Sequence, residues 1–263
     1  MTGSDAATGS TKQALPPGLP LFYREPELLV PERHGKLRML MTPDFRFARD
    51  TNAVPIMAGE FVQAARFYPV VFAGEPIMPV AVLGLERRNV FVDDAGAWDG
   101  PRTYIPAYVR RYPFTFIALQ GVFALGIDMA CDRLISGGEA SNDVRRLFED
   151  GKPTPFTQDA LRFCGALQGE QIATRTFAEA LAAYEILVDQ SARAVSGSGR
   201  NYDLQGFRIV DAKKLAALPD AVVIDWQKRG WLALIHAHIA SLACWHDLVA
   251  RVGEREVKSG EGN

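Results

Sequence analysis

The first half of the chain is patterned as short apolar runs separated by turn-forming residues. These runs cover residues 68–73, 79–85, 114–119 and 123–129. Each run has the length of a strand, and turn-forming residues rather than helix-length crossovers lie between them. The pattern predicts an antiparallel meander sheet, which one early helix over residues 55–67 interrupts.

From about residue 155 the apolar positions recur every three to four residues, as in amphipathic helices. Thr157 is the predicted N-cap of a first helix. Thr176 and Glu179, three residues apart, predict a capping box at the start of a second helix, which extends to Leu187 or Val188. The second half of the chain is therefore expected to be largely helical.

Two further helical segments are expected closer to the C-terminus. One is a short helix over residues 211–218, and the other covers residues 221–251 with a break at Gly230. Together these patterns predict an α+β protein. Its antiparallel meander sheet comes from the N-terminal half, and the helices that pack on the sheet come mainly from the C-terminal half.

The apolar stretch over residues 114–131 is nearly long enough for a membrane helix. Gln120 and Gly121 interrupt it in the middle, and Asp128 would lie in hydrocarbon. Its first half is short and β-prone. Two buried strands joined by a tight turn fit the stretch better, so no membrane span is predicted.

The two ends of the chain are polar and contain glycine. Residues 1–20 are expected to form a flexible leader and residues 252–263 a flexible tail, which leaves a single domain over residues 21–251. The Ser-Gly-Ser-Gly run at 196–199 is expected to be a loop. The start lacks the features of a secretory signal, so a cytoplasmic location is expected, with signal-less export left open.

Composition places the chain among ordinary globular proteins, with 263 residues of which 48% are hydrophobic. Its 29 basic and 31 acidic residues give a formal net charge of −2. This balance leaves no net positive field for a nucleic-acid backbone, so a nucleic-acid partner is not expected. The three cysteines, Cys131, Cys164 and Cys244, lie far apart among apolar or small residues and are expected to be buried thiols.

Several segments, in a fixed order along the chain, carry a resemblance to a known family. They are Asn52-Ala-Val-Pro55, Gly59-Glu-Phe61, Tyr68-Pro-Val-Val-Phe72, Leu83-Gly-Leu85, Asn89-Val-Phe-Val-Asp93, Tyr104-Ile-Pro-Ala-Tyr-Val-Arg-Arg-Tyr-Pro-Phe114, Gly126-Ile-Asp128 and Leu147-Phe-Glu-Asp-Gly151. The order resembles the SapC family of bacterial proteins over residues 23–249. The segment over residues 104–114, YIPAYVRRYPF, is its strongest part.

The resemblance implies a function only by association. The family takes its name from genes associated with bacterial surface layers, and many members occur in bacteria with TonB-dependent receptors and flavin halogenase-like proteins. No general enzymatic activity is established for it, so no catalytic residue can be transferred to this chain. The resemblance implies a non-catalytic accessory or interaction protein with a protein partner.

The alternative is an enzyme or a small-ligand sensor whose site contains the YIPAYVRRYPF segment. Two guanidinium groups among tyrosines favour an anionic or aromatic ligand. The candidate residues are Tyr104, Tyr108, Arg110, Arg111, Tyr112, Asn89, Trp98 and Asp128. In an extended segment Arg110 and Arg111 point to opposite faces, so only one of them faces a given pocket, and structural bracing is the competing interpretation.

The other candidate sites fail on spacing or context. On a helix, His236 and His238 are about 200° apart, whereas zinc-binding pairs are usually four residues apart. The polar loop around Asp93 lacks the order of ligands that calcium loops use, and Asp128 with Asp132 fits turn formation better than acid–base chemistry. Phosphate-loop and dinucleotide-binding motifs are absent from the sequence, so no metal or cofactor is predicted.

Overall fold

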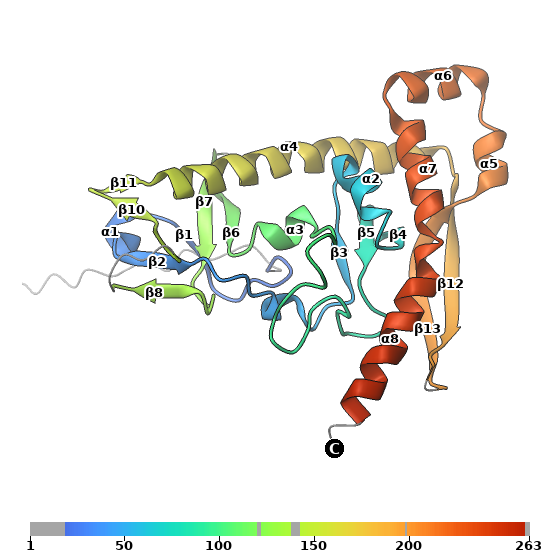
Figure 1. Cartoon of the computed structure of the whole chain (residues 1–263). Coiled ribbons are helices and arrows are strands. Elements are labelled where there is room, and N and C mark those ends of the chain that lie inside the picture. Colours follow the sequence, from blue (N-terminus) through green and yellow to red (C-terminus); the bar gives the residue numbers. More distant parts are fainter. Residues whose placement is uncertain (1–18, 120–121, 138–142, 198, 261–263) are drawn as a thin grey trace, which may run out of the picture.

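The computed structural model describes residues 19–119, 122–137, 143–197 and 199–260 (Figure 1). Helical residues outnumber strand residues in the described part of the chain. The sheets of the N-terminal half are antiparallel and most helices lie in the C-terminal half, which confirms the predicted α+β class.

The strands of the described residues form four sheets. The largest has the order β12-β13-β4-β5-β3, with β3 at Ala53–Pro55, β4 at Val70–Ala73, β5 at Met78–Val82, β12 at Leu187–Val195 and β13 at Asn201–Val210. A second sheet has the order β1-β7-β6, with β1 at Pro26–Leu28, β6 at Phe114–Leu119 and β7 at Val122–Asp128. The two small sheets are β8-β2-β9, at Leu134–Ser136, Leu37–Leu40 and Val144–Arg146, and β10-β11, at Phe148–Glu149 and Lys152–Pro153.

The predicted neighbouring strands pair as expected, but they belong to different sheets. β4 pairs with β5, and β6 pairs with β7 from Phe114 opposite Ile127 to Leu119 opposite Val122. The stretch over residues 114–131 is thus a pair of strands, as predicted, although Gln120 and Gly121 lie outside the described residues. No single described helix is long and apolar enough to cross a membrane, and one pair bent by 41°, Trp231–Ser241 with Cys244–Val257, meets that test only when taken together.

The sequence pattern missed the two longest strands, β12 and β13. The predicted second helix extends to Leu187 or Val188, yet both residues begin β12. The helix ends earlier because Glu185 has a φ of 53°, a left-handed conformation that α-helices do not contain. β13 then pairs with β4 through Phe207 opposite Ala73 and Arg208 opposite Phe72, so the C-terminal half completes the main sheet.

A single helix, α4 at Pro155–Ala183, replaces the two helices predicted for this region and runs along one side of the molecule (Figure 1). Its N-cap is Thr154, whose Oγ1 accepts a hydrogen bond from the Thr157 N–H; the predicted N-cap, Thr157, lies one turn inside the helix. The predicted capping box is also wrong. Thr176 donates its hydroxyl to the Ile172 carbonyl at 3.2 Å, a bond that lets a threonine lie within a helix.

The shorter helices match the pattern only in part. The early helix is a 3₁₀ turn, η2 at Ala58–Glu60, followed by α2 at Phe61–Ala64, because Pro55 belongs to β3. The remaining short helices before α4 are α1 at Pro31–His34, η1 at Arg46–Ala48 and α3 at Ala107–Arg110. Asp211 caps α5 at Ala212–Ala216, close to the prediction.

The final helical region is divided into α6 at Asp220–Lys228, α7 at Trp231–Ser241 and α8 at Cys244–Gly260. Gly230, with a φ of 73°, makes the predicted break. Residues 252–260 are helical, in contrast to the flexible tail expected there. Buried Val252 and a hydrogen bond from the Tyr202 hydroxyl to Glu256 hold this end of α8 against the β12–β13 hairpin.

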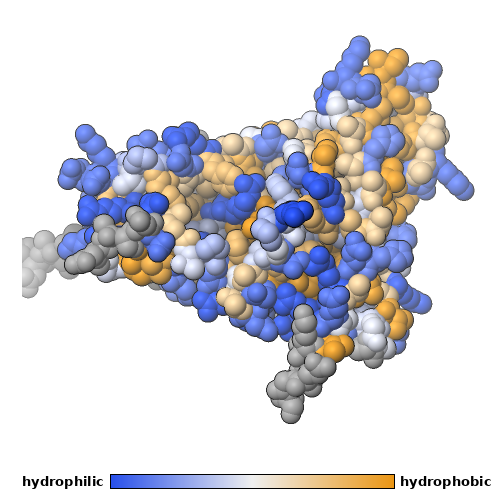
Figure 2. All heavy atoms as spheres, in the orientation of Figure 1, coloured by the Kyte–Doolittle hydropathy of each residue, from blue (hydrophilic) through white to orange (hydrophobic). Residues whose placement is uncertain are grey.

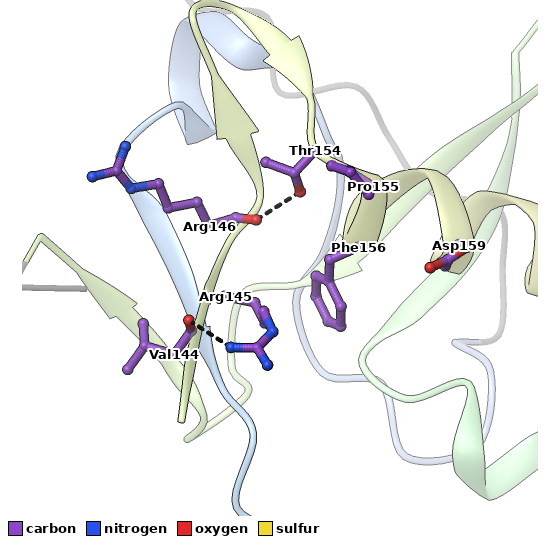
Figure 3. A pocket seen from close by; sticks show the side chains of 7 residues that line it. All are labelled: Val144, Arg145, Arg146, Thr154, Pro155, Phe156 and Asp159. Carbon is purple, nitrogen blue, oxygen red and sulfur yellow. Dashed lines mark hydrogen bonds between the residues drawn. The ribbon is translucent and has the colours of Figure 1, made fainter. Parts of the chain in front are cut away.

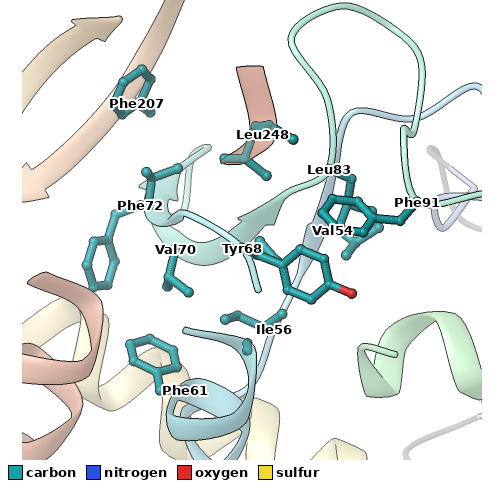
Figure 4. Packing of buried hydrophobic residues seen from close by; sticks show 14 of the residues in the cluster. Val54, Ile56, Phe61, Tyr68, Val70, Phe72, Leu83, Phe91, Phe207 and Leu248 are labelled. Atoms are coloured by element: carbon teal, nitrogen blue, oxygen red, sulfur yellow. The ribbon is translucent and has the colours of Figure 1, made fainter. Parts of the chain in front are cut away.

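The largest hydrophobic core lies around the five-stranded sheet and its covering helices (Figure 4). Tyr68 and Phe72 are fully buried there, together with Phe177 from α4, Ile235 from α7 and Leu248 from α8. Each such side chain stabilises the fold by roughly 1.5–3 kcal/mol when it leaves water. The three cysteines are buried and unpaired, as predicted.

His238 joins α7 to two strands of this sheet. Its Nδ1 lies 2.7 Å from the Val70 carbonyl, and its Nε2 accepts the Val210 N–H at 3.0 Å. This pattern assigns the proton to Nδ1 and requires a neutral ring. Burial lowers the pKa of His238 to about 4.

We expect His238 to make folding stability depend on pH. The unfolded chain takes up a proton at this histidine near pH 6.5, whereas the folded protein does so only near pH 4, so stability falls as the pH falls between these values. The full effect is about 3 kcal/mol. Denaturant unfolding from pH 7 to pH 4 should show a smaller loss for His238→Gln than for the unmodified chain, and an unchanged loss for the exposed control His236→Gln. Equal pH profiles for all three proteins would contradict this role.

Candidate functional site

The conformation expected from the sequence for the YIPAYVRRYPF segment is extended. In the structure the segment contains the short helix α3. Pro106 precedes the helix and Pro113 follows it, so the segment enters and leaves one helical turn sharply. Consecutive residues of a helix are about 100° apart, which separates Arg110 from Arg111. The two guanidinium groups therefore lie in different surroundings.

Glu60, which sequence analysis did not select, holds the start of this segment. Its Oε1 accepts hydrogen bonds from the Tyr104 hydroxyl at 2.8 Å and from the Ala107 N–H at 2.7 Å, and its Oε2 accepts the Met57 N–H at 2.8 Å. Burial, together with the adjacent carboxylate, raises the pKa of Tyr104 to about 12. The sequence signal that could have identified Glu60 was its place in Gly59-Glu-Phe61, one of the segments that resemble the family.

Arg110 lies on an aromatic surface and bonds to its own segment. Its guanidinium carbon is 5.6 Å from the centre of the Tyr104 ring and 5.3 Å from that of Phe163. Its Nε donates to the Ile105 carbonyl at 3.0 Å. These contacts are those of a bracing residue.

Arg111 is placed differently, between two tyrosine rings. Its guanidinium carbon lies 4.0 Å from the ring centre of Tyr108 and 5.5 Å from that of Tyr23. Its Nε is buried without a hydrogen-bond partner. In the described part of the chain no carboxylate lies within ion-pair distance of Arg111, so tyrosine faces rather than an acid stabilise this charge.

Trp98 and Tyr104 belong to a second cluster, which is linked through Tyr68. The Trp98 Nε1–H donates to the Tyr68 hydroxyl at 3.2 Å, and that hydroxyl donates to the Tyr104 carbonyl. Trp98 and Tyr68 are both buried. The cluster fastens the loop that carries Trp98 to the sheet.

Asn89 closes the backbone of a neighbouring turn. It is fully buried, donates through Nδ2 to the Ala48 carbonyl at 3.2 Å and accepts the Phe91 N–H at 2.9 Å. Both the nitrogen and the oxygen of the Asn89 side-chain amide are therefore hydrogen-bonded to the backbone of the protein itself.

Asp128 and Tyr112 form the third cluster. Asp128 is fully buried at the end of β7 and accepts the Glu25 N–H at 2.7 Å, the Arg24 N–H at 3.2 Å and the Tyr112 hydroxyl at 3.1 Å. Burial, with the nearby Cys131 and Asp128, raises the pKa of Tyr112. Asp132, the other carboxylate considered for acid–base chemistry, is exposed.

The structure thus brings four of the eight predicted residues together around Tyr23 and places the other four elsewhere. The four near Tyr23 are Tyr108, Arg111, Tyr112 and Asp128. Among the eight, Arg111 is the residue with a buried side-chain nitrogen that has no hydrogen-bond partner. Burial raises the pKa of the nearby Cys164 thiol to about 11, although Arg111 opposes that rise, so this thiol is protonated at neutral pH and is a poor nucleophile.

A hollow of about 430 Å³ lies elsewhere, where α4 begins (Figure 3). It is lined by Val144, Arg145, Arg146, Thr154, Pro155, Phe156 and Asp159. None of the predicted site residues is among them. Arg146 is paired with Glu149 at 3.3 Å, and the lining contains both arginine and aspartate, so the hollow does not favour one sign of ligand charge.

One row of residues along the solvent-facing side of α4 contains no charged residue over four turns, although the exposed Arg162 and Arg175 border it. We call this the α4 stripe, made up of Leu161, Gly165, Gln168, Ile172 and Thr176, which recur every three or four residues. Leu161 is 45% and Ile172 63% exposed.

The β6–β7 pair extends this apolar surface. A side-chain carbon added at Gly165 would lie 3.8 Å from the Phe116 ring, and Phe116 stacks on Phe123, which is 52% exposed. Figure 2 shows apolar colours where these strands meet α4. Single exposed apolar side chains are common on protein surfaces, but a contiguous group of them is typical of an interaction site.

The SapC family model matches residues 29–248. The chain belongs to the SapC family. No curated protein and no solved structure matches it. The match includes the YIPAYVRRYPF segment and α4 of this SapC protein, so both the aromatic clusters and the α4 stripe lie within the family region.

Side chains that commonly bind metals are not clustered among the described residues of this SapC protein. No three His, Cys, Asp or Glu side chains there are grouped so that they could hold an ion. His238 is bonded to the backbone on both sides, and His236 is exposed on another face of α7.

We expect Asp128 to be a structural residue of the SapC fold. Asp128→Ala leaves three backbone N–H groups and a tyrosine hydroxyl without their acceptor, at a cost of about 3 kcal/mol in the free energy of unfolding. Asp132→Ala, which changes an exposed carboxylate nearby, should shift it by less than about 0.5 kcal/mol. Urea unfolding followed by circular dichroism measures both values, and similar losses for the two variants would show that Asp128 is not the anchor.

Proposed function

We propose that this SapC-family protein is a non-catalytic accessory protein that binds a protein partner through the α4 stripe and the adjoining Phe123. The partner belongs to a bacterial surface-layer or TonB-dependent uptake system, the setting that the family association implies. The observation that carries the proposal is the exposure of apolar side chains, Leu161 and Ile172 on the α4 stripe and Phe123 on the adjoining β7.

The hydrogen bonds of the buried polar residues support the same proposal. Glu60, Asn89 and Asp128 are buried polar groups with the chemistry that a reaction needs, yet each accepts hydrogen bonds from the backbone. A carboxylate or amide used in this way stabilises the fold and is not free to move a proton or hold a substrate.

The partner surface that fits the α4 stripe is apolar and contains few charges. Gly165 and Gly169 lack side chains, and nothing lies within 4 Å of a carbon added at Gly169. A partner helix or loop can therefore approach the backbone of α4 closely at Gly169, while Phe116 lies against Gly165 and Leu161 and Ile172 offer apolar contacts along the stripe.

The test compares two equivalent substitutions of exposed helical isoleucines. Ile172 lies on the α4 stripe and is 63% exposed, whereas Ile224 lies on α6 and is 55% exposed. The immobilised full-length chain should capture a surface-layer or TonB-dependent uptake component from a bacterium that encodes it. Ile172→Glu should reduce the recovery at least about tenfold, because it places a charge in a desolvated contact, and Ile224→Glu should not.

Two results would contradict the proposal. One is equal recovery of the partner by the unmodified chain, Ile172→Glu and Ile224→Glu, which would place the contact elsewhere. The other is recovery that depends on Ile172 but yields no component of either system, which would remove the proposed setting.

A second candidate function, binding of a small anionic aromatic ligand, is favoured by Arg111 alone. Its buried Nε has no hydrogen-bond partner and its charge has no acidic partner among the described residues, while Tyr108 offers a ring for stacking. Benzoate supplies both a carboxylate and an aromatic ring and is the appropriate probe.

Arg110 provides the matched control for this candidate. Saturating benzoate should raise the unfolding temperature of the unmodified chain and of Arg110→Met by about 2–4 °C and leave Arg111→Met unchanged. The candidate fails if the unmodified chain shows no rise, or if Arg111→Met shows the same rise.

A further inference from the structure

The outer strand of the main sheet, β12, has an open edge. It covers nine residues, Leu187–Val195, and pairs on one side with β13; among the described strands none pairs with its other side. The opposite edge of the same sheet is β3, which has only three residues and ends at Pro55, a residue without an N–H. β12 contains no proline and no lysine, two of the usual devices that block strand addition, and its charged residues are one aspartate and one arginine.

The open edge of β12 is regular along its whole length. Gln190 pairs with Phe207 and Ala192 with Leu204, so two steps along β12 correspond to three along β13. The extra residue therefore lies in β13, where Gly206 has a φ of 79° that suits a bulge. The irregularity belongs to the inner strand, and β12 contains no extra residue.

The hydrogen bonds at the two ends of the hairpin fix which backbone groups face outward. The Ile186 carbonyl accepts the Asp211 N–H, and the Ser196 N–H donates to the Arg200 carbonyl. In an antiparallel ladder the direction alternates, so even-numbered residues of β12 turn their backbone toward β13. Residues 187, 189, 191, 193 and 195 present theirs to the open edge.

We propose that β12 pairs with β12 of a second copy of this chain, antiparallel and centred on Ser191. This register matches outward-facing residues with outward-facing residues throughout. Ser191 then lies opposite the second Ser191, Asp189 opposite Arg193, and Leu187 opposite Val195. The two five-stranded sheets become one continuous sheet across a twofold axis.

The side chains of β12 are self-complementary in this register. Within one chain Asp189 pairs with Arg208 at 3.0 Å and Arg193 with Asp203 at 4.0 Å, yet the two side chains remain 91% and 85% exposed, so both can also bond across the new edge. The twofold axis creates their ion pair twice. Val195, 60% exposed in the single chain, packs against Leu187 of the second copy.

A shift of this register by one residue would remove both the backbone match and the charge pairing. Outward-facing backbone groups would then meet inward-facing ones, and Asp189 would no longer face Arg193. The contact consists of one strand pair and is smaller than most stable interfaces, so a dissociation constant in the micromolar range is expected.

Charge reversal tests the register directly. Sedimentation equilibrium of the full chain should give a monomer–dimer equilibrium, and Asp189→Arg or Arg193→Glu should each weaken it at least about tenfold, because each creates two like-charge pairs. A mixture of the two variants should dimerise as the unmodified chain does. In the mixed dimer the introduced arginine faces the introduced glutamate, and the unchanged Arg193 of one copy faces the unchanged Asp189 of the other. This recovery separates a lost contact from a misfolded variant.

A backbone substitution provides an independent test. Ser191→Pro removes an N–H that faces the open edge and not β13, so it should abolish dimerisation while the thermal unfolding of the chain stays close to that of Ser191→Ala. Ser191→Ala should dimerise normally, because the backbone at this position is unchanged.

Three outcomes would overturn the proposal. The first is an unmodified chain that stays monomeric at concentrations on the order of 100 μM. The second is a dimer that Ser191→Pro leaves intact, and the third is a mixture of the two charge variants that fails to associate.

Discussion

The backbone of the first half of the chain depends on a few buried polar side chains that accept or donate hydrogen bonds where sheets and helices do not. Its strands are short, and the segments between them leave many N–H groups without a regular partner. Glu60 satisfies the segment before α2 and the start of α3, Asn89 satisfies a loop, and Asp128 satisfies the start of β1. His238 performs the same task between α7 and the main sheet.

This arrangement explains why the family motifs resemble an active site in the sequence. Tyrosine, arginine, asparagine, tryptophan and aspartate close together are typical of ligand-binding sites, but the same residue types also brace irregular backbone. In this SapC protein Tyr104, Trp98, Asn89 and Asp128 have internal hydrogen-bond partners. Arg111 differs from them, because its buried Nε has no such partner and its charge has no acidic partner among the described residues.

The sequence was sufficient for the elements that local pattern determines. The strands β4 to β7 follow from apolar runs, and the break at Gly230 follows from a left-handed residue. The hairpin β12–β13 was not predictable in this way, because its position depends on the pairing of Phe207 with Ala73 far along the chain. Thr157 and Thr176 were plausible caps, but Thr154 and the packing of one face of α4 produced a single long helix. The α4 stripe was similarly hidden, since which face of a helix meets solvent is decided by the fold.

The position of β4 has a consequence for how the chain reaches its native state. β4 ends at Ala73, but its partner β13 begins at Asn201, and the ring of His238 that bonds to Val70 comes later still. During synthesis β3, β4 and β5 therefore emerge well before the strand and the helices that cover them. Contacts of such high sequence separation slow folding, because the intervening chain must lose its freedom before they form. Until then β4 exposes an unpaired edge and an apolar face, so the nascent chain passes through a period in which a chaperone would recognise it.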